Sequence, residues 1–288
     1  MKADKLSALI ALLDDPDKTV YKQVEKELLE ENSSIIRQLE QIWETSLDSL
    51  IQERIENLTR QIRFRETSKR IQNWYREEEE DLFEGFFLIS RYQYPELKSA
   101  EMRNRIRRIR SDVWLEINNR LTSIEKITVL NHIFYDVYQF NINQSDVLSP
   151  RACFLNHILD TKEGNPVSMA ILYTLVAREL DFPVLLVDFP KNPLLAYVDE
   201  ELARKAHGPG YHSQVLFYIN PLNRGAIIGR REVEFMLRKE GQVNASSFAT
   251  PCKDRIIIRK LVESLITAYS FAGRQDKADE LTGIVSLL

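Results

Sequence analysis

Cysteine, glycine and proline are all scarce in this sequence of 288 residues. Its two cysteines, Cys153 and Cys252, are too few for a disulfide framework, and free thiols suit a reducing compartment. Nine glycines and ten prolines are few for this length. This scarcity favours long helices and argues against a turn-rich all-β fold.

The sequence also lacks a strong charge of one sign and a long apolar run. A net charge of -4 gives no general electrostatic case for binding nucleic acid or an anionic membrane. The longest uncharged stretch, Gly164 to Ala177, is too short to cross a bilayer, and the N-terminus lacks the apolar core of a signal peptide. We therefore expect a cytoplasmic protein with no membrane partner. The apolar share of 44% is enough for a substantial core.

The N-terminal residues are spaced as amphipathic helices. Leu6, Leu9, Ile10 and Leu13 share one helical face, Pro16 marks a turn, and further stripes follow as far as Trp43. The run LLDDPDKTVYKQVEKELLEENSSIIRQLEQIWE resembles a HEAT repeat, in which short helices stack side by side. A single repeat cannot bury its own apolar face, so these helices must pack on their neighbours.

Four more helices are predicted before residue 141. Their expected ranges are 47–64, 68–91, 99–121 and 123–140, and the last has Ile127, Leu130, Ile133, Phe134 and Val137 facing inward. An acidic run (Glu77 to Asp81) and a basic run (Arg103 to Arg110) lie among them. Because the arginines alternate with apolar residues at helical spacing, a solvated helix face is favoured over a nucleic-acid site. The nucleic-acid module stays the weakest of three hypotheses.

The pattern changes after residue 164. Asn165 is a good N-cap and Pro166 suits the first helical position, so a helix is predicted over 167–180. It is apolar on nearly all sides, which is typical of the centre of a domain. Strands are predicted over 182–189, 194–199 and 213–219, followed by two C-terminal helices. The fold class is therefore α+β, mostly helical, with a small antiparallel sheet.

Specific motifs carry a family resemblance. The segments GNPVSMAILYTLVARELDFPVLLVDFP and INPLNRG resemble the transglutaminase-like superfamily, which has a papain-like core. With EGFFLISRYQYP and SPRACFLNHIL upstream, they resemble its SirB-type branch. The C-terminal hairpin, with its turn at 271–276, is similar to a tetratricopeptide unit. The resemblance implies a HEAT-like segment over 1–64, a core over 65–250 and a tetratricopeptide-like hairpin over 251–288.

The resemblance also implies where a catalytic triad would lie. Active members have a cysteine at the N-terminus of the buried helix, where the helix dipole favours a thiolate, and a histidine and an acid on the next strands. Here the three positions correspond to Pro166, Asn192 and Asn220, none of which can act as nucleophile, base or acid. The resemblance therefore implies a pseudoenzyme that binds a protein or peptide. The candidate residues of the binding cleft are Asn165, Ser168, Asn192, Tyr211, His212, Asn220 and Asn223.

A displaced cysteine site is the rival hypothesis. Cys153 and His157 are four residues apart on a helix predicted over 151–159, and Arg151 could lower the pKa of the thiol. A hydrolase or acyltransferase could use Cys153 with His157 or with His212. The alternative is that Cys153 is a buried structural thiol. His207 and His212 are too few for a zinc site, and we expect neither metal nor cofactor. Ser168, in a buried helix, is expected to bond to the backbone.

Overall fold

Helices carry most of the chain, as its few glycines and prolines predict. The structure, a computed structural model, describes residues 8–31, 33–77, 81–143, 147–208, 210–241 and 250–286. Leu6 and the glutamates at 78–80, both used in the sequence predictions, lie outside the described residues. The elements divide into two units, residues 1–71 and 72–288. With one small antiparallel sheet, the α+β fold class is confirmed.

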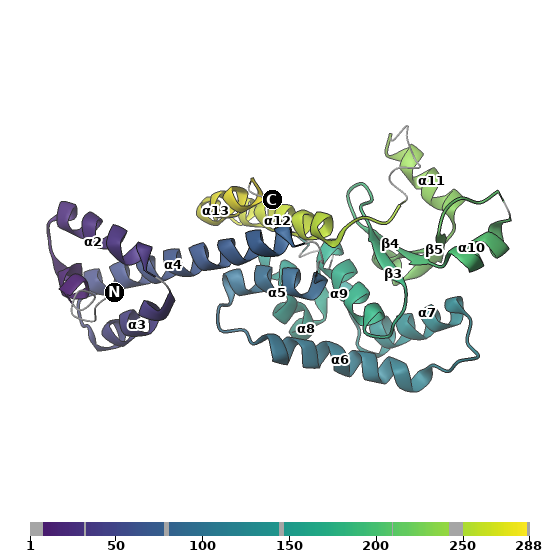
Figure 1. Cartoon of the computed structure of the whole chain (residues 1–288), viewed down its shortest axis with the longest axis horizontal. Coiled ribbons are helices and arrows are strands. Elements are labelled where there is room, and N and C mark those ends of the chain that lie inside the picture. Colours follow the sequence, from purple (N-terminus) through teal and green to yellow (C-terminus); the bar gives the residue numbers. More distant parts are fainter. Residues whose placement is uncertain are drawn as a thin grey trace. The chain divides into compact units, whose positions relative to one another are not determined.

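Unit 1 is built from α2 (Lys18–Glu30), α3 (Ile36–Thr45) and the first part of α4 (Ser49–Arg76) (Figure 1). The guanidinium of Arg54 is buried, and its Nη1 donates to the carbonyls of Leu13 and Asp15 at 2.7 and 2.8 Å. The remaining core is aliphatic, and it consists of Leu9, Leu13, Val24, Leu28, Ile35, Leu39, Ile55, Leu58 and Ile62. These residues confirm the apolar stripes that the sequence predicts.

Helix α4 corrects one prediction. Two helices were expected over 47–64 and 68–91, but the chain stays helical from Ser49 to Arg76 and resumes only in α5 (Leu82–Gln93). No proline or glycine interrupts residues 49–76, so nothing in the sequence ends the helix there. Asp81 begins α5, because its side chain accepts a hydrogen bond from the backbone N–H of Glu84 at 3.1 Å.

Unit 2 continues with helices around a central one. They are α6 (Ser99–Glu116), α7 (Ser123–Asn131), η4 (Pro150–Cys153), α8 (Leu155–Thr161) and α9 (Pro166–Arg178). After α7 the chain forms a π-helical turn, η3 (His132–Val137). Because a π turn holds more residues than an α turn, the inward face shifts, and Val137 is 56% exposed. The prediction that Val137 faces inward is therefore wrong, while Ile127, Leu130, Ile133 and Phe134 are buried as expected.

The central helix α9 is buried from Val167 to Ala177 and packs on α5, α6, α8, α12 and the sheet. The sheet has the order β3-β4-β5-β6 and is antiparallel throughout. Its strands are β3 (Val184–Val187), β4 (Leu194–Val198), β5 (Val215–Asn220) and β6 (Ala226–Ile228). The first three confirm the predicted strands. The sequence patterns missed β6 and a two-residue parallel pair, β1 (Asn141–Ile142) with β2 (Glu163–Gly164).

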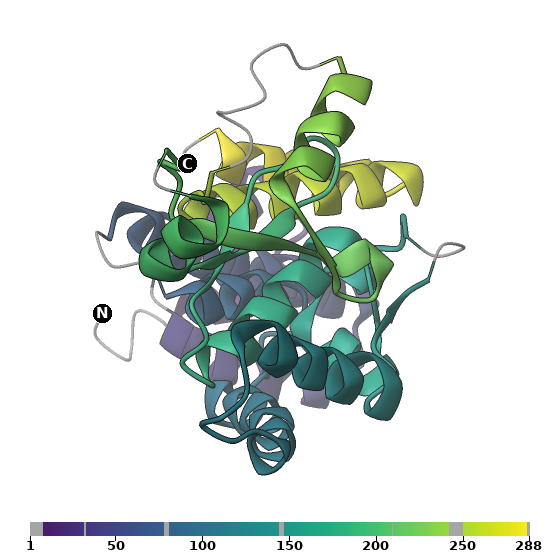
Figure 2. The same ribbon diagram turned by 90° about the vertical axis from the view of Figure 1, so that its right-hand side faces the viewer.

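Alternate residues of the strands divide the core into two layers. Val187, Ala196 and Tyr218 pack against Val233 and Leu237 of α11 (Arg230–Lys239) on one face. Leu186, Leu195 and Ile219 are fully buried on the other face, toward α9. A short helix, α10 (Glu200–His207), lies along β5. Figure 2 shows α11, in light green, above the strands.

The chain ends in a helical hairpin, α12 (Asp254–Phe271) and α13 (Gln275–Val285), that packs on α5 (Figure 1). Polar contacts fix its position: the Tyr92 hydroxyl donates to Glu280 and the Tyr269 hydroxyl donates to Gln93, both at 2.8 Å. Burial and Glu280 raise the pKa of Tyr92 far above its usual value, so this hydroxyl stays a donor. The division into three domains expected from the sequence stays a prediction.

Candidate functional site

The N-terminus of α9 is capped by side chains next to it in the sequence. The triad cysteine of the resembled family would lie there. Asn165 is the N-cap and Pro166 is the first helical residue. The side chain of Asn165 accepts from the backbone N–H of Ser168 at 2.8 Å, and the backbone N–H of Asn165 lies 3.0 Å from the Ser168 Oγ. This reciprocal capping box confirms the predicted cap. Pro166 has no backbone N–H, and the capping box uses those of Asn165 and Ser168, so these two groups are not free to stabilise an oxyanion.

Ser168 is fully buried and serves the backbone. Its hydroxyl lies 2.7 Å from the carbonyl oxygen of Ala152 and 3.1 Å from that of Asn165, which is the bond one turn back that a serine in a buried helix is expected to make. Gly164 is needed two residues before the helix, because a Cβ there would lie 2.9 Å from the Ser168 Oγ and 3.1 Å from Met169. A side chain at position 164 would therefore collide with the residues that cap the helix, whereas Pro166 itself is half-buried.

Cys153 lies beside this cap but is not activated by it. Its side chain is fully buried, and the Asn165 Nδ2 donates to its Sγ at 3.0 Å. Burial raises the pKa of the Cys153 thiol to about 12, although the Asn165 amide acts in the opposite direction. The lowering of this pKa suggested from the sequence is therefore wrong. The thiol is held neutral, and a neutral thiol is a poor nucleophile.

The single helix predicted over 151–159 is also wrong. Cys153 ends the short 3-10 turn η4, whereas His157 lies on α8, and Phe154 between them is extended with φ -107° and ψ 132°. The two residues therefore do not have the one-turn spacing on which the displaced dyad depended. His157 is half-buried.

The other two positions expected for the triad lie at one end of the sheet. Asn192 is in the connection between β3 and β4, and its backbone N–H donates to the carbonyl of Pro190 at 2.8 Å. Asn220 ends β5, and its side chain accepts from the backbone N–H of Leu222 at 3.1 Å. Since β4 and β5 are antiparallel with Leu195 opposite Ile219, both asparagines lie at the same end. Asn223 follows, exposed in the short turn η5 (Pro221–Asn223).

Two predicted cleft residues, Tyr211 and His212, line a separate groove of about 870 Å³ in unit 2. The Tyr211 hydroxyl donates to the carbonyl of Val215 at 2.9 Å, and its ring lies 4.4 Å from that of His207. The His207 Nε2 is 2.9 Å from the carbonyl of Leu216. The two side chains thus contact the carbonyls of Val215 and Leu216 in β5, beyond the end of the short edge strand β6. The other lining residues are Glu200, Arg204, Ser213, Gln214, Tyr218, Arg230, Thr250 and Pro251.

Each arginine of the groove forms an ion pair with a glutamate on its own helix. Arg204 pairs with Glu200 at 2.6 Å and Arg230 with Glu234 at 2.7 Å, each pair one turn apart on its helix. The Arg204 pair is exposed, whereas the Arg230 pair is half-buried. An exposed pair contributes only about 0–1 kcal/mol, so a ligand carboxylate can replace Glu200 at little cost. The Arg230 guanidinium also lies 5.6 Å from the Tyr211 ring centre. Asn165, Ser168, Asn192, Asn220 and Asn223 are not among the residues that line this groove.

The basic run on α6 is occupied by contacts within unit 2. Arg103 pairs with Asp81 at 2.8 Å, Arg105 with Asp160 at 2.8 Å, and the Nε of Arg110 donates to the carbonyl of Glu179 at 3.1 Å. These pairs favour a structural role over phosphate binding. Within the described ranges no group of three His, Cys, Asp or Glu side chains could hold a metal. Over the same residues, no helix combines the length and apolar character of a membrane span.

Comparison with known proteins identifies relatives for the core. A family model described as the transglutaminase-like superfamily matches residues 100–263, more than half of the chain. F-box only protein 21 of Mus musculus is 23% identical over 154 residues, which are 54% of this chain and 23% of the mouse protein. A UPF0162 protein of Xylella fastidiosa (strain 9a5c) is 23% identical over 198 residues, 66% of either chain.

A UPF0162 protein of Pasteurella multocida is 30% identical over 89 residues, 31% of this chain and 34% of that protein. The chain thus spans between about a quarter and two thirds of the length of these curated relatives. No solved structure matches it.

Proposed function

Because the chain belongs to the transglutaminase-like superfamily, we propose that it keeps the core of that family as a non-catalytic scaffold that binds a protein or peptide. The proposal includes the finer assignments drawn from the sequence: a SirB-type core over 65–250, a HEAT-like segment over 1–64 and a tetratricopeptide-like hairpin over 251–288. The cytoplasm is the proposed compartment.

One observation carries the proposal: the N-terminus of α9 presents no activated nucleophile. Pro166 stands where the nucleophile would be, and the neighbouring Cys153 is fully buried with its pKa raised to about 12. Loss of a single triad member typically costs several orders of magnitude in rate. With all three positions replaced, the family mechanism has no nucleophile, no base and no acid to proceed through.

The groove beside Tyr211 is the proposed binding site. Its lining includes two arginines, a histidine, one glutamate and several hydroxyl groups, together with the half-buried Tyr211. Arginine and tyrosine are the side chains most often responsible for binding energy at protein interfaces. Because Arg204 is held only by an exposed ion pair, an extended segment with an acidic side chain suits the groove best. The cap on the β5 carbonyls argues against strand addition at that edge.

A displayed library of random peptides, selected on the purified full chain, tests this proposal. Peptides that contain acidic residues should be enriched. Tyr211→Ala and Arg230→Met should each lower the affinity for these peptides by roughly tenfold. Glu116→Gln, on the exposed end of α6, should leave the affinity unchanged. If the selected peptides bind the Tyr211→Ala variant with full affinity, the groove is not their binding site.

The non-catalytic part needs its own assay. The wild-type chain and a Cys153→Ala variant should give the same background rate on a panel of fluorogenic amides and thioesters. A turnover above that of heat-denatured protein that disappears in Cys153→Ala would revive the hydrolase or acyltransferase hypothesis.

A further inference from the structure

The outer face of α11 carries an exposed aromatic ring among basic side chains. Val233 and Leu237 are fully buried on the inner face, against the sheet (Figure 2). An α-helix turns about 100° per residue, so Arg231, Phe235 and Arg238 lie in one narrow stripe on the opposite side. Phe235 is 63% exposed, and both arginines are exposed as well. One face of α11 therefore belongs to the core, and the other is left uncovered by the described residues.

Three cations of this face lack a carboxylate partner among the described residues. Arg231, Arg238 and the neighbouring Lys239 are all exposed, and none of them forms an ion pair there. The carboxylate best placed for Arg238 is that of Glu234, one turn earlier, but it pairs with Arg230 at 2.7 Å. Arg231 lies in the first turn, where the helix dipole disfavours a cation, so an external anion would stabilise this end of the helix.

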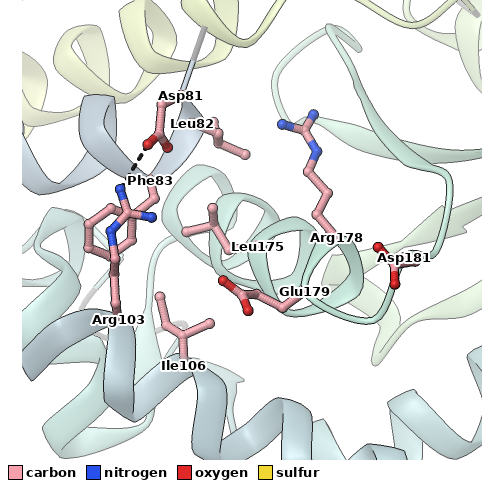
Figure 3. Close-up of a pocket in the computed structure, with 9 residues that line it drawn as sticks. All are labelled: Asp81, Leu82, Phe83, Arg103, Ile106, Leu175, Arg178, Glu179 and Asp181. Carbon is pink, nitrogen blue, oxygen red and sulfur yellow. Dashed lines mark hydrogen bonds and ion pairs between the residues drawn. The ribbon is translucent and has the colours of Figure 1, made fainter. Parts of the chain in front are cut away.

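Other arginines of unit 2 are neutralised by carboxylates. Figure 3 shows the guanidinium of Arg103 bonded to Asp81, at a distance of 2.8 Å. Arg178 forms two hydrogen bonds to the buried Asp254. Among the residues of α11, by contrast, Glu232 has the only exposed carboxylate, and it lies at the edge of the outer face. This face is thus locally basic, although the net charge of the chain is -4.

The spacing of these charges defines the chemistry of a partner. Arg231 lies four residues before Phe235, and Arg238 and Lys239 lie three and four residues after it. A partner helix with an apolar side chain and carboxylates at the same spacings can pack on the ring and pair with the cations. Aromatic and arginine side chains are enriched at protein interfaces. Nucleic acid suits this face less, because three cations beside a glutamate neutralise few phosphates.

We propose that the outer face of α11 binds an acidic amphipathic helix of a partner protein. The residues of this docking face are Arg231, Phe235, Arg238 and Lys239. None of them lines the groove at Tyr211, so the inference goes beyond the function proposed for that groove. An apolar residue of the partner packs on Phe235, and its carboxylates pair with the three cations.

Binding of a synthetic peptide to the full chain, followed by fluorescence anisotropy, tests the inference. The probe is an alanine-based helical peptide with a central leucine and with glutamates three and four residues on either side, so that it matches the face in both orientations. It should bind saturably, and added salt should weaken the binding. Three control peptides, with glutamine or lysine in place of glutamate or with alanine in place of leucine, should bind at least about tenfold more weakly.

Two variants of the docking face, Phe235→Ala and Arg231→Gln/Arg238→Gln, should each bind the acidic peptide about tenfold more weakly than the wild type. Because these side chains are exposed, both variants should keep the circular dichroism spectrum of the wild type. Tyr211→Ala should bind the peptide with unchanged affinity. A loss in this variant would place the peptide in the groove and overturn the inference.

Matched substitutions elsewhere separate this face from the effects of overall charge and apolarity. Phe271→Ala, at an exposed phenylalanine of α12, and Arg107→Gln/Arg108→Gln, at exposed arginines of α6, should leave the affinity unchanged. Losses equal to those of the α11 variants would overturn the inference. So would a wild type that does not bind the acidic peptide, that binds a phosphatidylserine vesicle or a DNA duplex more tightly, or that forms a dimer abolished by Phe235→Ala.

Discussion

The side-chain amide of Asn165 donates to the Sγ of Cys153 at 3.0 Å while its carbonyl oxygen caps α9. Asn165 thus links the N-terminus of α9, where the family's catalytic cysteine is expected, to the buried thiol of Cys153. The thiol receives a neutral donor, and burial leaves its pKa raised to about 12. The same side chain would stabilise a thiolate only weakly, so its main contribution is to the structure.

The first prediction concerns this cap. Asn165→Ala should lower the free energy of unfolding by about 1–2 kcal/mol, because the backbone N–H of Ser168 loses its acceptor at a buried helix end. Urea denaturation followed by circular dichroism measures the change. Asn223→Ala, at an exposed position, should alter stability by less than about 0.5 kcal/mol. Equal effects of the two substitutions would contradict the assigned role of Asn165.

The second prediction concerns Gly225, in the motif INPLNRG. Its φ is +72°, and a Cβ there would lie 1.9 Å from the Oδ1 of Asn131. Asn131 itself donates to the carbonyl of Gly225 at 2.8 Å and accepts from the Tyr173 hydroxyl at 2.8 Å. Gly225→Ala should therefore cost more than about 3 kcal/mol, the combined cost of strain and a broken buried network.

Gly273 offers a close control, since it has the same φ of +72° but a Cβ added to it would meet no atom within 4 Å. Gly273→Ala should lower the free energy of unfolding by only about 1–2 kcal/mol, because it adds backbone strain without a steric clash. Thermal and urea unfolding of both variants separates the two contributions. If the two substitutions cost the same, the contact with Asn131 is not a significant constraint.

The third prediction concerns the bidentate pair between Arg178 on α9 and the buried Asp254 on α12. Arg178→Met should cost about 3–5 kcal/mol, because it leaves a buried carboxylate without its partner. Adding Asp254→Asn should recover part of this loss, which a double-mutant cycle detects. The exposed pair of Arg204 and Glu200 should give a coupling of at most about 1 kcal/mol in the same assay.

The sequence predicted most of the fold because local signals and packing agree. Asn165 and Pro166 mark the start of α9 and its apolar character marks its central position, so the helix was placed correctly. The break expected near residue 65 was wrong, since apolar spacing alone does not end a helix. Val137 was misassigned because a π turn depends on tertiary packing and leaves no clear mark in the periodicity.

The candidate sites were predicted less completely. Tyr211 and His212 were predicted by family analogy and line a groove in the structure. Arg204 and Arg230 line the same groove but come from two helices, and no local sequence pattern connects them. The helix predicted to carry both Cys153 and His157 was wrong because the extended Phe154 interrupts it, whereas the dyad itself stays a prediction.

The central claim, that no activated cysteine is present, is tested most directly by the alkylation of Cys153 and Cys252 as a function of pH. Iodoacetamide labelling of the folded chain, resolved by mass spectrometry of peptides, gives a rate for each thiol. Burial raises the pKa of both thiols to about 12, with Asp188 also contributing at Cys252.

Both thiols should therefore react slowly at neutral pH and gain rate only as the pH rises well above 9, with Cys153 slower because it is fully buried. Denaturation should restore the ordinary rate and pKa of a free cysteine. Rapid alkylation of Cys153 at neutral pH in the folded chain, with an apparent pKa below about 8, would contradict the account and reinstate cysteine catalysis.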